Sequence, residues 1–192
     1  MQHPFIADKT FKDFNNVKQR LTKAEYENCI FERCNFADGD LANQNFMECK
    51  FIACNLSNTN LTNTIFKDCL FKESKMVGVK FSDCNSFLMS FTFENCILDF
   101  ASFYQLKIKN TRFIASKLEG VDFTETDLSG CQFDRCDLKG AIFQHSLLER
   151  ADFRTAFNYS LDPEINRIKK ALFAAPEVVG LLQKYDIVIE QQ

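Results

Sequence analysis

The fold is decided by residues 118–138, which read LEGVDFTETDLSGCQFDRCDL. A large apolar residue recurs at every fifth position of this stretch, at Leu118, Phe123, Leu128, Phe133 and Leu138. A period of five fits neither an α-helix, which repeats every 3.6 residues, nor a flat strand, which repeats every two. It is typical of a solenoid built from one short repeat.

The five-residue spacing extends far beyond this stretch. One series of apolar centres runs from Tyr26 to Phe81, and a second runs from Leu88 to Phe153. Two residues before most centres lies a smaller residue, and the positions between are mainly Asp, Asn, Glu, Lys, Thr and Ser. We therefore expect short extended segments with the large and the small residue pointing inward and a turn closing each repeat.

A twenty-residue level confirms that four repeats make one coil. Phe93, Phe113, Phe133 and Phe153 form one column, and aliphatic centres form the columns between it and a second Phe column at Phe103, Phe123 and Phe143. Stacked at the strand spacing, residues 25–160 would give six to seven coils and a rod roughly 30 Å long. The sequence predicts an all-β, right-handed quadrilateral β-helix with a small C-terminal helical cap.

The register breaks once, at residues 82–87, because Phe81 and Leu88 are seven residues apart. The surrounding stretch is unusually apolar, and Phe91 and Leu106 occupy positions where the pattern favours a small residue. Two interpretations stay open. The break is either a local bulge with swollen packing, or an exposed apolar bump that contacts a partner.

Both ends depart from the repeat. Residues 1–24 are basic and are expected to cap the first coil, because an open end exposes core and unpaired strand edges. In residues 161–192, Asp162-Pro163-Glu164 resembles a helix N-terminus, a helix is expected from Pro176, and residues 187–189 are expected to form a strand. This apolar end predicts a two-fold dimer. The expected interface residues are Phe173, Leu181, Leu182, Ile187 and Ile189.

Charge is distributed unevenly. Residues 1–24 carry 5 Lys/Arg against 2 Asp/Glu, a net of +3, whereas residues 25–162 carry 14 against 20, a net of −6. An acidic rod does not favour direct nucleic-acid binding, which needs a basic surface. The densest acidic belt, the candidate partner-binding surface, comprises Asp99, Glu119, Asp122, Glu125, Asp127, Asp134 and Asp137.

Nothing in the sequence marks a catalytic, cofactor or metal site. All nine Cys fall at the small inward position, which predicts a packing role, and there is no Cys-x-x-Cys pair. No nucleophile motif and no Gly-rich phosphate loop is present, so we expect a protein that is not an enzyme and needs no cofactor. No apolar run reaches the length of a membrane span and the start does not resemble a secretory signal, which together predict a cytoplasmic protein.

The repeat resembles the pentapeptide-repeat family, whose pattern is approximately A(D/N)LXX. The resemblance rests on phrases such as ADFRT at 151–155 and TDLSG at 126–130, and it covers about residues 25–160. The Cys- and Phe-rich stretch 27–36 and the end of the chain are similar to the Qnr and MfpA quinolone-resistance group. That resemblance implies a head-to-head dimer through the C-terminus and an acidic rod that imitates duplex DNA and engages DNA gyrase or topoisomerase IV. The chain lacks the long projecting loops of Gram-negative Qnr proteins and in this respect is closer to MfpA.

Two functions are therefore expected. The first is a DNA mimic that binds DNA gyrase or topoisomerase IV and protects it from quinolones, because regularly spaced carboxylates on a rigid rod suit a basic DNA-binding groove. The second is a protein-interaction scaffold with another partner. A continuous negative stripe would favour the first, and a patchy charge pattern would favour the second.

Overall fold

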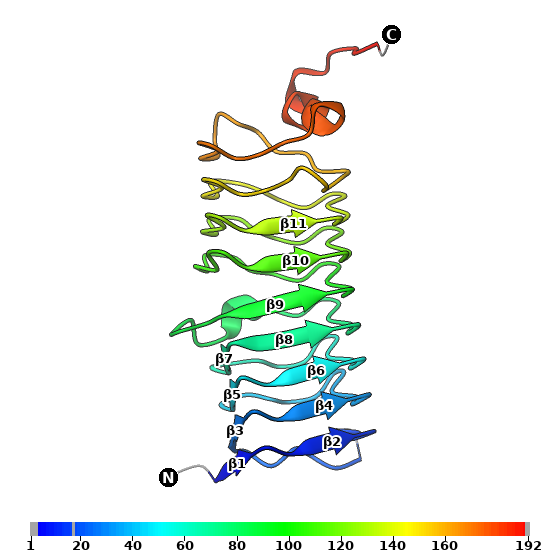
Figure 1. Cartoon of the computed structure of the whole chain (residues 1–192), viewed down its shortest axis with the longest axis vertical. Helices are drawn as coiled ribbons and strands as arrows, with labels where there is room; N and C mark the ends of the chain where they lie inside the picture. Colours follow the sequence, from blue (N-terminus) through cyan, green and yellow to red (C-terminus); the bar gives the residue numbers. More distant parts are fainter. Residues whose placement is uncertain (1–3, 17, 191–192) are drawn as a thin grey trace.

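The computed structural model, which describes residues 4–16 and 18–190, is a straight rod of stacked parallel coils (Figure 1). It is the expected right-handed quadrilateral β-helix. One side of the rod carries a four-stranded parallel sheet made of β1 (Phe5–Ala7), β3 (Glu25–Glu27), β5 (Asn45–Met47) and β7 (Ile65–Lys67). The adjacent side carries a seven-stranded sheet made of β2 (Thr10–Lys12), β4 (Ile30–Glu32), β6 (Lys50–Ile52), β8 (Cys69–Lys72), β9 (Phe91–Glu94), β10 (Arg112–Ile114) and β11 (Gln132–Asp134).

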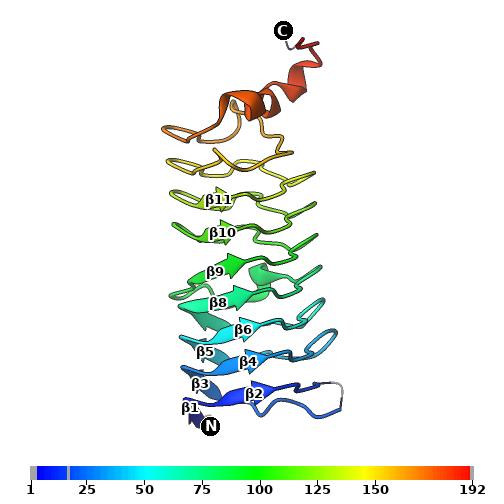
Figure 2. The same cartoon turned by 45° about the vertical axis from the view of Figure 1, so that its right-hand side comes forward.

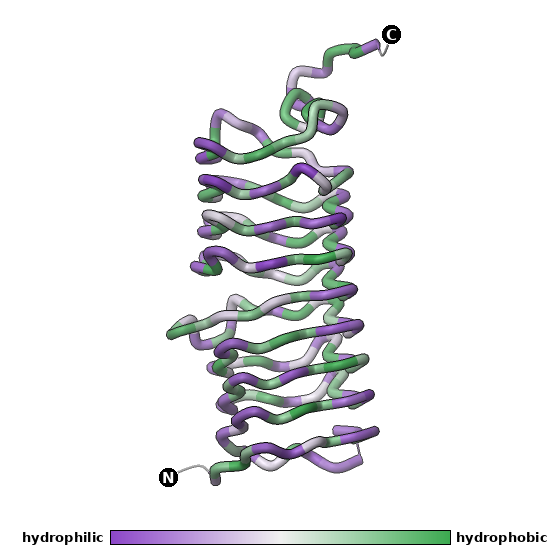
Figure 3. The backbone as a smooth tube through the Cα atoms, viewed as in Figure 1, coloured by the Kyte–Doolittle hydropathy of each residue, from purple (hydrophilic) through white to green (hydrophobic). Residues whose placement is uncertain are grey.

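The strand register repeats the twenty-residue spacing of the sequence. Phe31 pairs with Phe51, and Phe113 pairs with Phe133. Across the break the offset is two residues longer, since Phe71 pairs with Phe93. The remaining sides are joined by isolated parallel bridges, and apolar and polar residues alternate along each coil (Figure 3).

A continuous column of aromatic rings runs the length of the rod behind the seven-stranded sheet. Consecutive ring centroids are 4.7 to 5.3 Å apart and the rings are nearly parallel. The members are Phe11, Phe31, Phe51, Phe71, Phe93, Phe113, Phe133, Phe153 and Phe173. Because burial of aromatic rings stabilises the folded state, this column is a central part of the hydrophobic core.

The second aromatic column changes sides at the register break. Below the break it consists of Tyr26, Phe46 and Phe66, with centroids 5.3 and 5.4 Å apart. Above the break it begins at Phe81, in the 3₁₀ helix η1 (Phe81–Asp83), whose ring lies 4.7 Å from that of Phe103. The break therefore joins two blocks of the rod that differ in how their cores are filled.

The break itself combines buried and exposed apolar residues. Phe91 is buried and its ring contacts that of Phe81 at 5.5 Å, which is the swollen packing expected there. Phe87 and Leu88 instead project into solvent, 69% and 58% exposed. The Ser90 hydroxyl ties the loop down, since it donates to the Asp68 carboxylate at 2.8 Å. The loop thus combines the swollen packing of the first interpretation with the exposed apolar residues of the second, and contact of these residues with a partner stays a prediction.

The N-terminal segment follows the register of the coils rather than lying across their end. Ile6 pairs with Tyr26 in the β1–β3 ladder, and Phe11 pairs with Phe31 in the β2–β4 ladder. The segment 1–24, proposed as a cap, therefore contributes a coil to the rod between its described residues 5 and 12. Ile6, Phe11 and Leu21 continue the five-residue spacing back from Tyr26, and the coil was missed because Asn16 interrupts that series.

The C-terminal end differs from the sequence prediction in three details. The expected helix start at Asp162 is wrong, because its carboxylate instead accepts the Glu164 amide at 2.8 Å in a turn. The coil then continues to Phe173, and the cap is the 3₁₀ helix η2 (Ala175–Leu181) followed by η3 (Gln183–Tyr185). The expected strand at 187–189 is also wrong, since these residues have no regular structure. Pro176 lies in the first turn of η2, as expected.

One buried side chain offers a stability test. The amide of Gln44 is 1% exposed, and neither its nitrogen nor its oxygen has a hydrogen-bond partner among the described residues. An unsatisfied buried polar group costs about 1–3 kcal/mol. Gln44→Met keeps the volume and removes both polar atoms, so we expect the free energy of unfolding to rise by about 1–2 kcal/mol in urea denaturation. The same change at exposed Gln144 should have an effect below about 0.5 kcal/mol. A destabilised Gln44→Met variant would contradict this account.

Candidate protein-binding surface

The acidic belt predicted from the sequence forms a band around the rod rather than one stripe. Asp134 lies in β11, on the side of the seven-stranded sheet, and its carboxylate accepts from Thr155 on the next coil. Asp99 and Glu119 lie on the next side in adjacent coils, where the Asp99 carboxylate accepts the Glu119 amide at 3.2 Å. Asp137 belongs to the same side, and its carboxylate accepts from Asn158 at 2.8 Å.

The sides beyond them hold the other members. Asp122 bonds the Thr124 amide at 2.9 Å, and Glu125 accepts from Gln105 of the preceding coil at 2.7 Å. Asp127 is only 7% exposed, and its carboxylate is occupied by Ser129 and Lys109. The belt residues are thus placed in consecutive coils but are divided among all the sides.

The groups around Asp127 explain why its carboxylate can be buried and still be charged. Burial alone would raise the pKa of Asp127, but hydrogen bonds from Ser129 and the ammonium group of Lys109 outweigh it and hold the pKa below its usual value. The Lys109 nitrogen lies 3.1 Å from the carboxylate. Asp127 is therefore an ionised structural group, and a partner could reach its charge only by displacing Lys109.

Basic side chains from neighbouring coils also interrupt the belt. Lys139 pairs with Glu119 at 3.3 Å, and Arg135 pairs with Asp134 at 3.1 Å. The sequence stretch 118–134 contains no Lys or Arg, but the stacking of coils brings Lys139 beside Glu119, and Arg135 follows Asp134 directly in the chain. These pairs are exposed, so each contributes little to stability and can be broken by a partner.

An exposed aromatic residue lies within the acidic region and was missed by the sequence analysis. Phe100 is 65% exposed and occupies a turn between two sides with a positive φ of 59°. Bulky residues rarely adopt this left-handed conformation, which favours Gly, Asn and Asp. The Phe100 ring lies over Gly120 of the next coil, where an added Cβ would come within 2.7 Å of ring atom Cδ1. Tyr104, on the following side, is 40% exposed.

A signal for Phe100 exists in the sequence. The stacked positions at the same corner are Asp38, Asn58, Gly78, Gly120 and Gly140, all with positive φ. A Phe at a turn position otherwise occupied by Asp, Asn and Gly departs from the repeat, and it places a large aromatic ring on the surface. We call the set formed by Asp99, Phe100, Tyr104, Glu119, Asp122 and Glu125 the acidic–aromatic patch.

The proposed dimer residues divide into two groups. Phe173 is half-buried and stacks on Phe153 at 5.3 Å, so its ring belongs to the core column. Leu181 is partly buried and packs against the core from η2. By contrast, Leu182, Ile187 and Ile189, together with Val179 and Gln183, line a shallow apolar pocket of 270 Å³ at the end of the chain.

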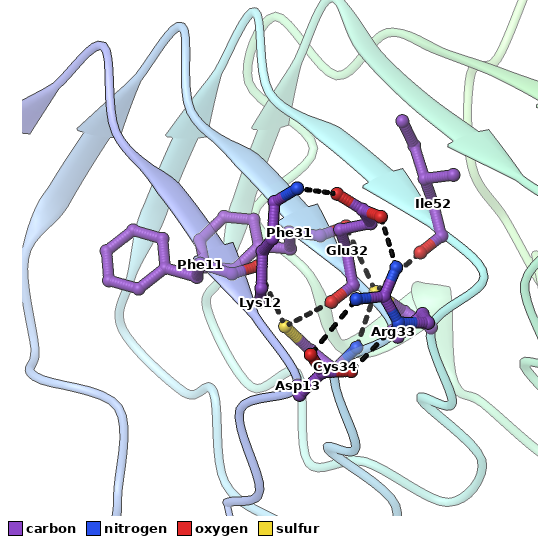
Figure 4. A network of polar contacts seen from close by, with 9 residues as sticks. Phe11, Lys12, Asp13, Phe31, Glu32, Arg33, Cys34 and Ile52 are labelled. Carbon is purple, nitrogen blue, oxygen red and sulfur yellow. Dashed lines mark hydrogen bonds and ion pairs between the residues drawn. The ribbon is translucent and has the colours of Figure 1, made fainter.

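The N-terminal half carries a polar network on the seven-stranded sheet (Figure 4). Arg33 bonds the Asp13 carboxylate at 2.8 Å and also contacts Glu32, which Lys12 approaches at 2.9 Å. The guanidinium holds the pKa of Asp13 below its usual value through a hydrogen bond. All these groups are at least partly exposed, so we interpret the network as surface ties between adjacent coils.

The nine cysteines are free and buried, in agreement with the packing role. Their thiols act like the hydroxyls at equivalent positions: Cys131 donates to the Ile108 carbonyl at 3.1 Å, and Thr126 donates to the Phe103 carbonyl at 2.8 Å. Among the residues that the structure describes, no group of three or more His, Cys, Asp or Glu is arranged to hold a metal ion. Cys therefore substitutes for Ser and Thr inside the coils.

We expect these thiols to be unreactive in the folded protein. Burial raises the pKa of Cys49 and of Cys131 to about 12, so almost no thiolate forms at these two positions at pH 8, and all nine thiols are shielded from reagents by burial. Treatment with iodoacetamide at pH 8, followed by intact-mass measurement, should leave the native chain largely unmodified and add nine adducts in guanidinium chloride. Rapid labelling of the native chain would show that the coils open readily.

These features define a parallel β-solenoid whose core is filled by stacked aromatic rings and free, buried thiols. Models of pentapeptide repeats match the chain at residues 29–68 and 49–85, and a model of the pentapeptide repeat region matches residues 86–157. The chain belongs to the pentapeptide-repeat family. Among curated proteins, none matches its sequence.

Solved structures with a similar fold include relatives of low identity. A trypsin-treated variant of QnrB1, described as a plasmid-mediated fluoroquinolone resistance protein, is 20% identical with a TM-score of 0.45, covering 98% of this chain and 99% of its own. Full-length QnrB1 is 18% identical with a TM-score of 0.38, covering 94% and 99%. HetL, involved in heterocyst differentiation regulation in the cyanobacterium Nostoc sp. strain PCC 7120, is 14% identical with a TM-score of 0.39, covering 91% and 88%. Within the described part of the chain, no helix is long and apolar enough to cross a membrane.

Proposed function

We propose that this chain is a non-enzymatic binding protein that engages a type II topoisomerase, DNA gyrase or topoisomerase IV, and protects it from quinolones. The observation that carries the proposal is the acidic–aromatic patch. Asp99 and Glu119 lie on the side before the Phe100 turn, Asp122 and Glu125 lie beyond it, and Phe100 itself is exposed. An aromatic anchor among charged groups is a common composition for a protein-binding surface. The partner follows from the resemblance of the sequence to the Qnr and MfpA group, and the likeness to solved structures concerns the fold.

In this proposal the carboxylates take the place of DNA phosphates. Asp99 and Glu119 stack at the spacing of successive coils, which is about 4.8 Å. A basic groove built for duplex DNA would attract such a rod and release the cations that now pair with it, such as Lys139. Phe100 would then supply apolar contact that DNA itself does not offer.

A second function, a scaffold for another protein, is supported by the patchiness of the charge. Lys109, Arg135 and Lys139 each pair with one belt residue, so the negative surface is not continuous. Duplex DNA presents an uninterrupted series of phosphates, whereas a scaffold needs only one complementary patch. The same patch would serve both functions, and the identity of the partner separates them.

Binding and supercoiling assays with purified gyrase test the first function. We expect the chain to bind gyrase at low salt and to relieve quinolone inhibition, with weaker binding as salt rises. Glu119→Lys combined with Glu125→Lys should reduce binding at least about tenfold, a loss of about 1.4 kcal/mol. The matched control is Glu48→Lys with Glu73→Lys, two exposed glutamates that share the positive φ of Glu125 but lie in the other half of the rod.

Phe100→Ala separates apolar contact from charge, and we expect it to weaken binding without changing its salt dependence. If the wild-type chain neither binds gyrase or topoisomerase IV nor changes quinolone inhibition at low salt, the topoisomerase function fails and the scaffold function replaces it.

We further propose that the chain forms a homodimer through its C-terminal apolar pocket. Val188 is 88% exposed and Ile187 56%, an unusual exposure for aliphatic residues beside a concave apolar surface. A chain that stops after Asp186 keeps η2 and η3 and should sediment as a monomer, whereas the full chain should sediment as a dimer at micromolar concentration. A full-length monomer would refute the dimer and leave the cap intact.

A further inference from the structure

The two ends of the rod are closed in different ways. At the C-terminal end, η2 covers the last coil, and the Leu161 amide donates to the Gly180 carbonyl at 3.1 Å. At the N-terminal end, β1 and β2 are the last strands of their sheets, and no described segment lies beyond them (Figure 2). The N-terminal end therefore presents two sheet edges that pair on one side only.

The backbone of the first coil confirms this one-sidedness. Asp8 and Asp13 donate to carbonyls of the second coil at 3.1 and 3.0 Å, and the Lys9 carbonyl accepts from that coil at 2.9 Å. In a parallel ladder, peptide groups point alternately to the two neighbouring strands. Those of Thr10 and Lys12, which flank the inward residue of β2, therefore point away from the rod, where an added strand could pair with them.

The underside of the first coil is also apolar. The rings of Phe11 and Phe14 are partly buried, and each contacts an aromatic ring of the second coil, with Phe11 stacked on Phe31 at 4.9 Å. Higher in the column, a ring such as Phe51 has a stacked neighbour on both sides. The lower faces of the first rings lack that second neighbour among the described residues.

A basic rim surrounds this end. Lys9, Lys18, Arg20 and Lys23 are exposed, and none forms an ion pair within the described part of the chain. Leu21, which lies between Arg20 and Lys23, is buried, and its amide donates to the Asn16 side chain at 2.9 Å, which anchors the backbone beside these cations. Positive charge is therefore held in place around an open, apolar sheet edge.

We propose that the N-terminal edge is a docking site for an extended, acidic segment of another protein, which adds a strand to β2. An apolar side chain of that segment would lie beneath Phe11, and the side chains on either side of it would face Thr10 and Lys12, so that an acidic residue meets Lys12. Further acidic side chains would meet the basic rim. A second copy of this chain fits poorly, since two ends of net charge +3 repel each other. Lysines commonly protect exposed sheet edges from pairing with a second copy of the same chain. Here the same lysines would favour binding of an acidic strand.

The probe for this site is a fluorescein-labelled peptide of sequence Glu-Val-Glu-Phe-Glu-Val-Glu, added to the full chain at low salt. Fluorescence anisotropy should report saturable binding. The same peptide with N-methyl groups on alternate residues cannot pair along that edge, and we expect it to bind at least tenfold more weakly. A peptide with Lys in place of Glu should not bind.

Variants of the protein locate the site. Lys18→Glu with Arg20→Glu and Lys23→Glu should weaken binding of the acidic peptide at least tenfold, while Lys169→Glu with Lys170→Glu, at the opposite end, should leave it unchanged. Circular dichroism of each variant checks that the rod is intact. Equal binding of the N-methylated peptide would overturn the edge pairing. Loss of binding in the Lys169→Glu, Lys170→Glu variant would overturn the N-terminal site. Self-association of the chain through its N-terminus would overturn the proposed occupant.

Discussion

Phe123→Ala is expected to lower the free energy of unfolding by about 3–5 kcal/mol, the usual cost of removing a fully buried ring. The Phe123 side chain is 0% exposed and is enclosed by aromatic rings. Phe103 and Phe143 stack on its two faces, each at 5.3 Å. Phe113 and Phe133 meet it edge-on at 6.0 Å. Truncation leaves a cavity whose lining is held by strands above and below, so the site can collapse only slightly.

Urea denaturation monitored by circular dichroism measures this loss. The matched control is Phe100→Ala, which removes the same atoms from a ring that is 65% exposed, and we expect it to change stability by less than about 1 kcal/mol. Because coils contact only their neighbours, hydrogen exchange should accelerate most in the coils next to position 123. Equal effects of the two truncations would contradict the stacked core.

The columns of the core could be predicted because inward residues recur in a solenoid at one fixed interval. One coil takes twenty residues and each coil repeats the environment of the one before. Phe113 and Phe133 are twenty residues apart, and they therefore stack on each other. The apolar spacing alone was enough to give the fold, the register and the place of the break. It also placed the cysteines inside. It was wrong at Leu88, expected as an inward centre, which projects from the break loop and is 58% exposed.

The candidate surface was less predictable because exposure depends on what neighbouring coils supply. Asp127 has the outward position expected for a belt residue, yet Ser129 and Lys109 enclose it. Lys109 lies outside residues 118–134, the stretch without Lys or Arg that suggested an uninterrupted belt. The stacking of coils places it beside Asp127. Phe100 was overlooked for a related reason, since its exposure results from a turn with positive φ and not from the apolar period.

The ends could be predicted only in outline because the repeat no longer constrains them. The proline at 176 indicated a helix start, and the helix there is the 3₁₀ helix η2, which approaches the last coil closely at Gly180. Residues 187–189 have the composition of a strand but no neighbouring strand edge within the described residues. Strand propensity reflects packing on a pleated surface, which this segment lacks.

Gly180→Ala is expected to detach the C-terminal cap and to cost roughly 2–3 kcal/mol, the range seen when a well-packed site is overfilled. A Cβ at this position would collide with the Tyr159 carbonyl oxygen and would lie 2.8 Å from ring atom Cδ2 of Tyr159. The obstacle includes backbone, which cannot rotate aside as a flexible side chain can. The hydrogen bond from the Leu161 amide to the Gly180 carbonyl would be lost as η2 moves away.

Hydrogen exchange at the Leu161 amide measures this detachment directly, and we expect it to rise at least tenfold while exchange in β9 to β11 stays unchanged. The control is Val178→Ala, at an exposed position of the same helix that is 39% accessible, where we expect little change. Detachment would uncover the rings of Tyr159 and Phe173 and leave the last coil as open as the first. Unchanged protection of Leu161 in Gly180→Ala would show that η2 does not depend on this close approach, and that the cap is held mainly by other contacts, such as the packing of Leu181 against the core.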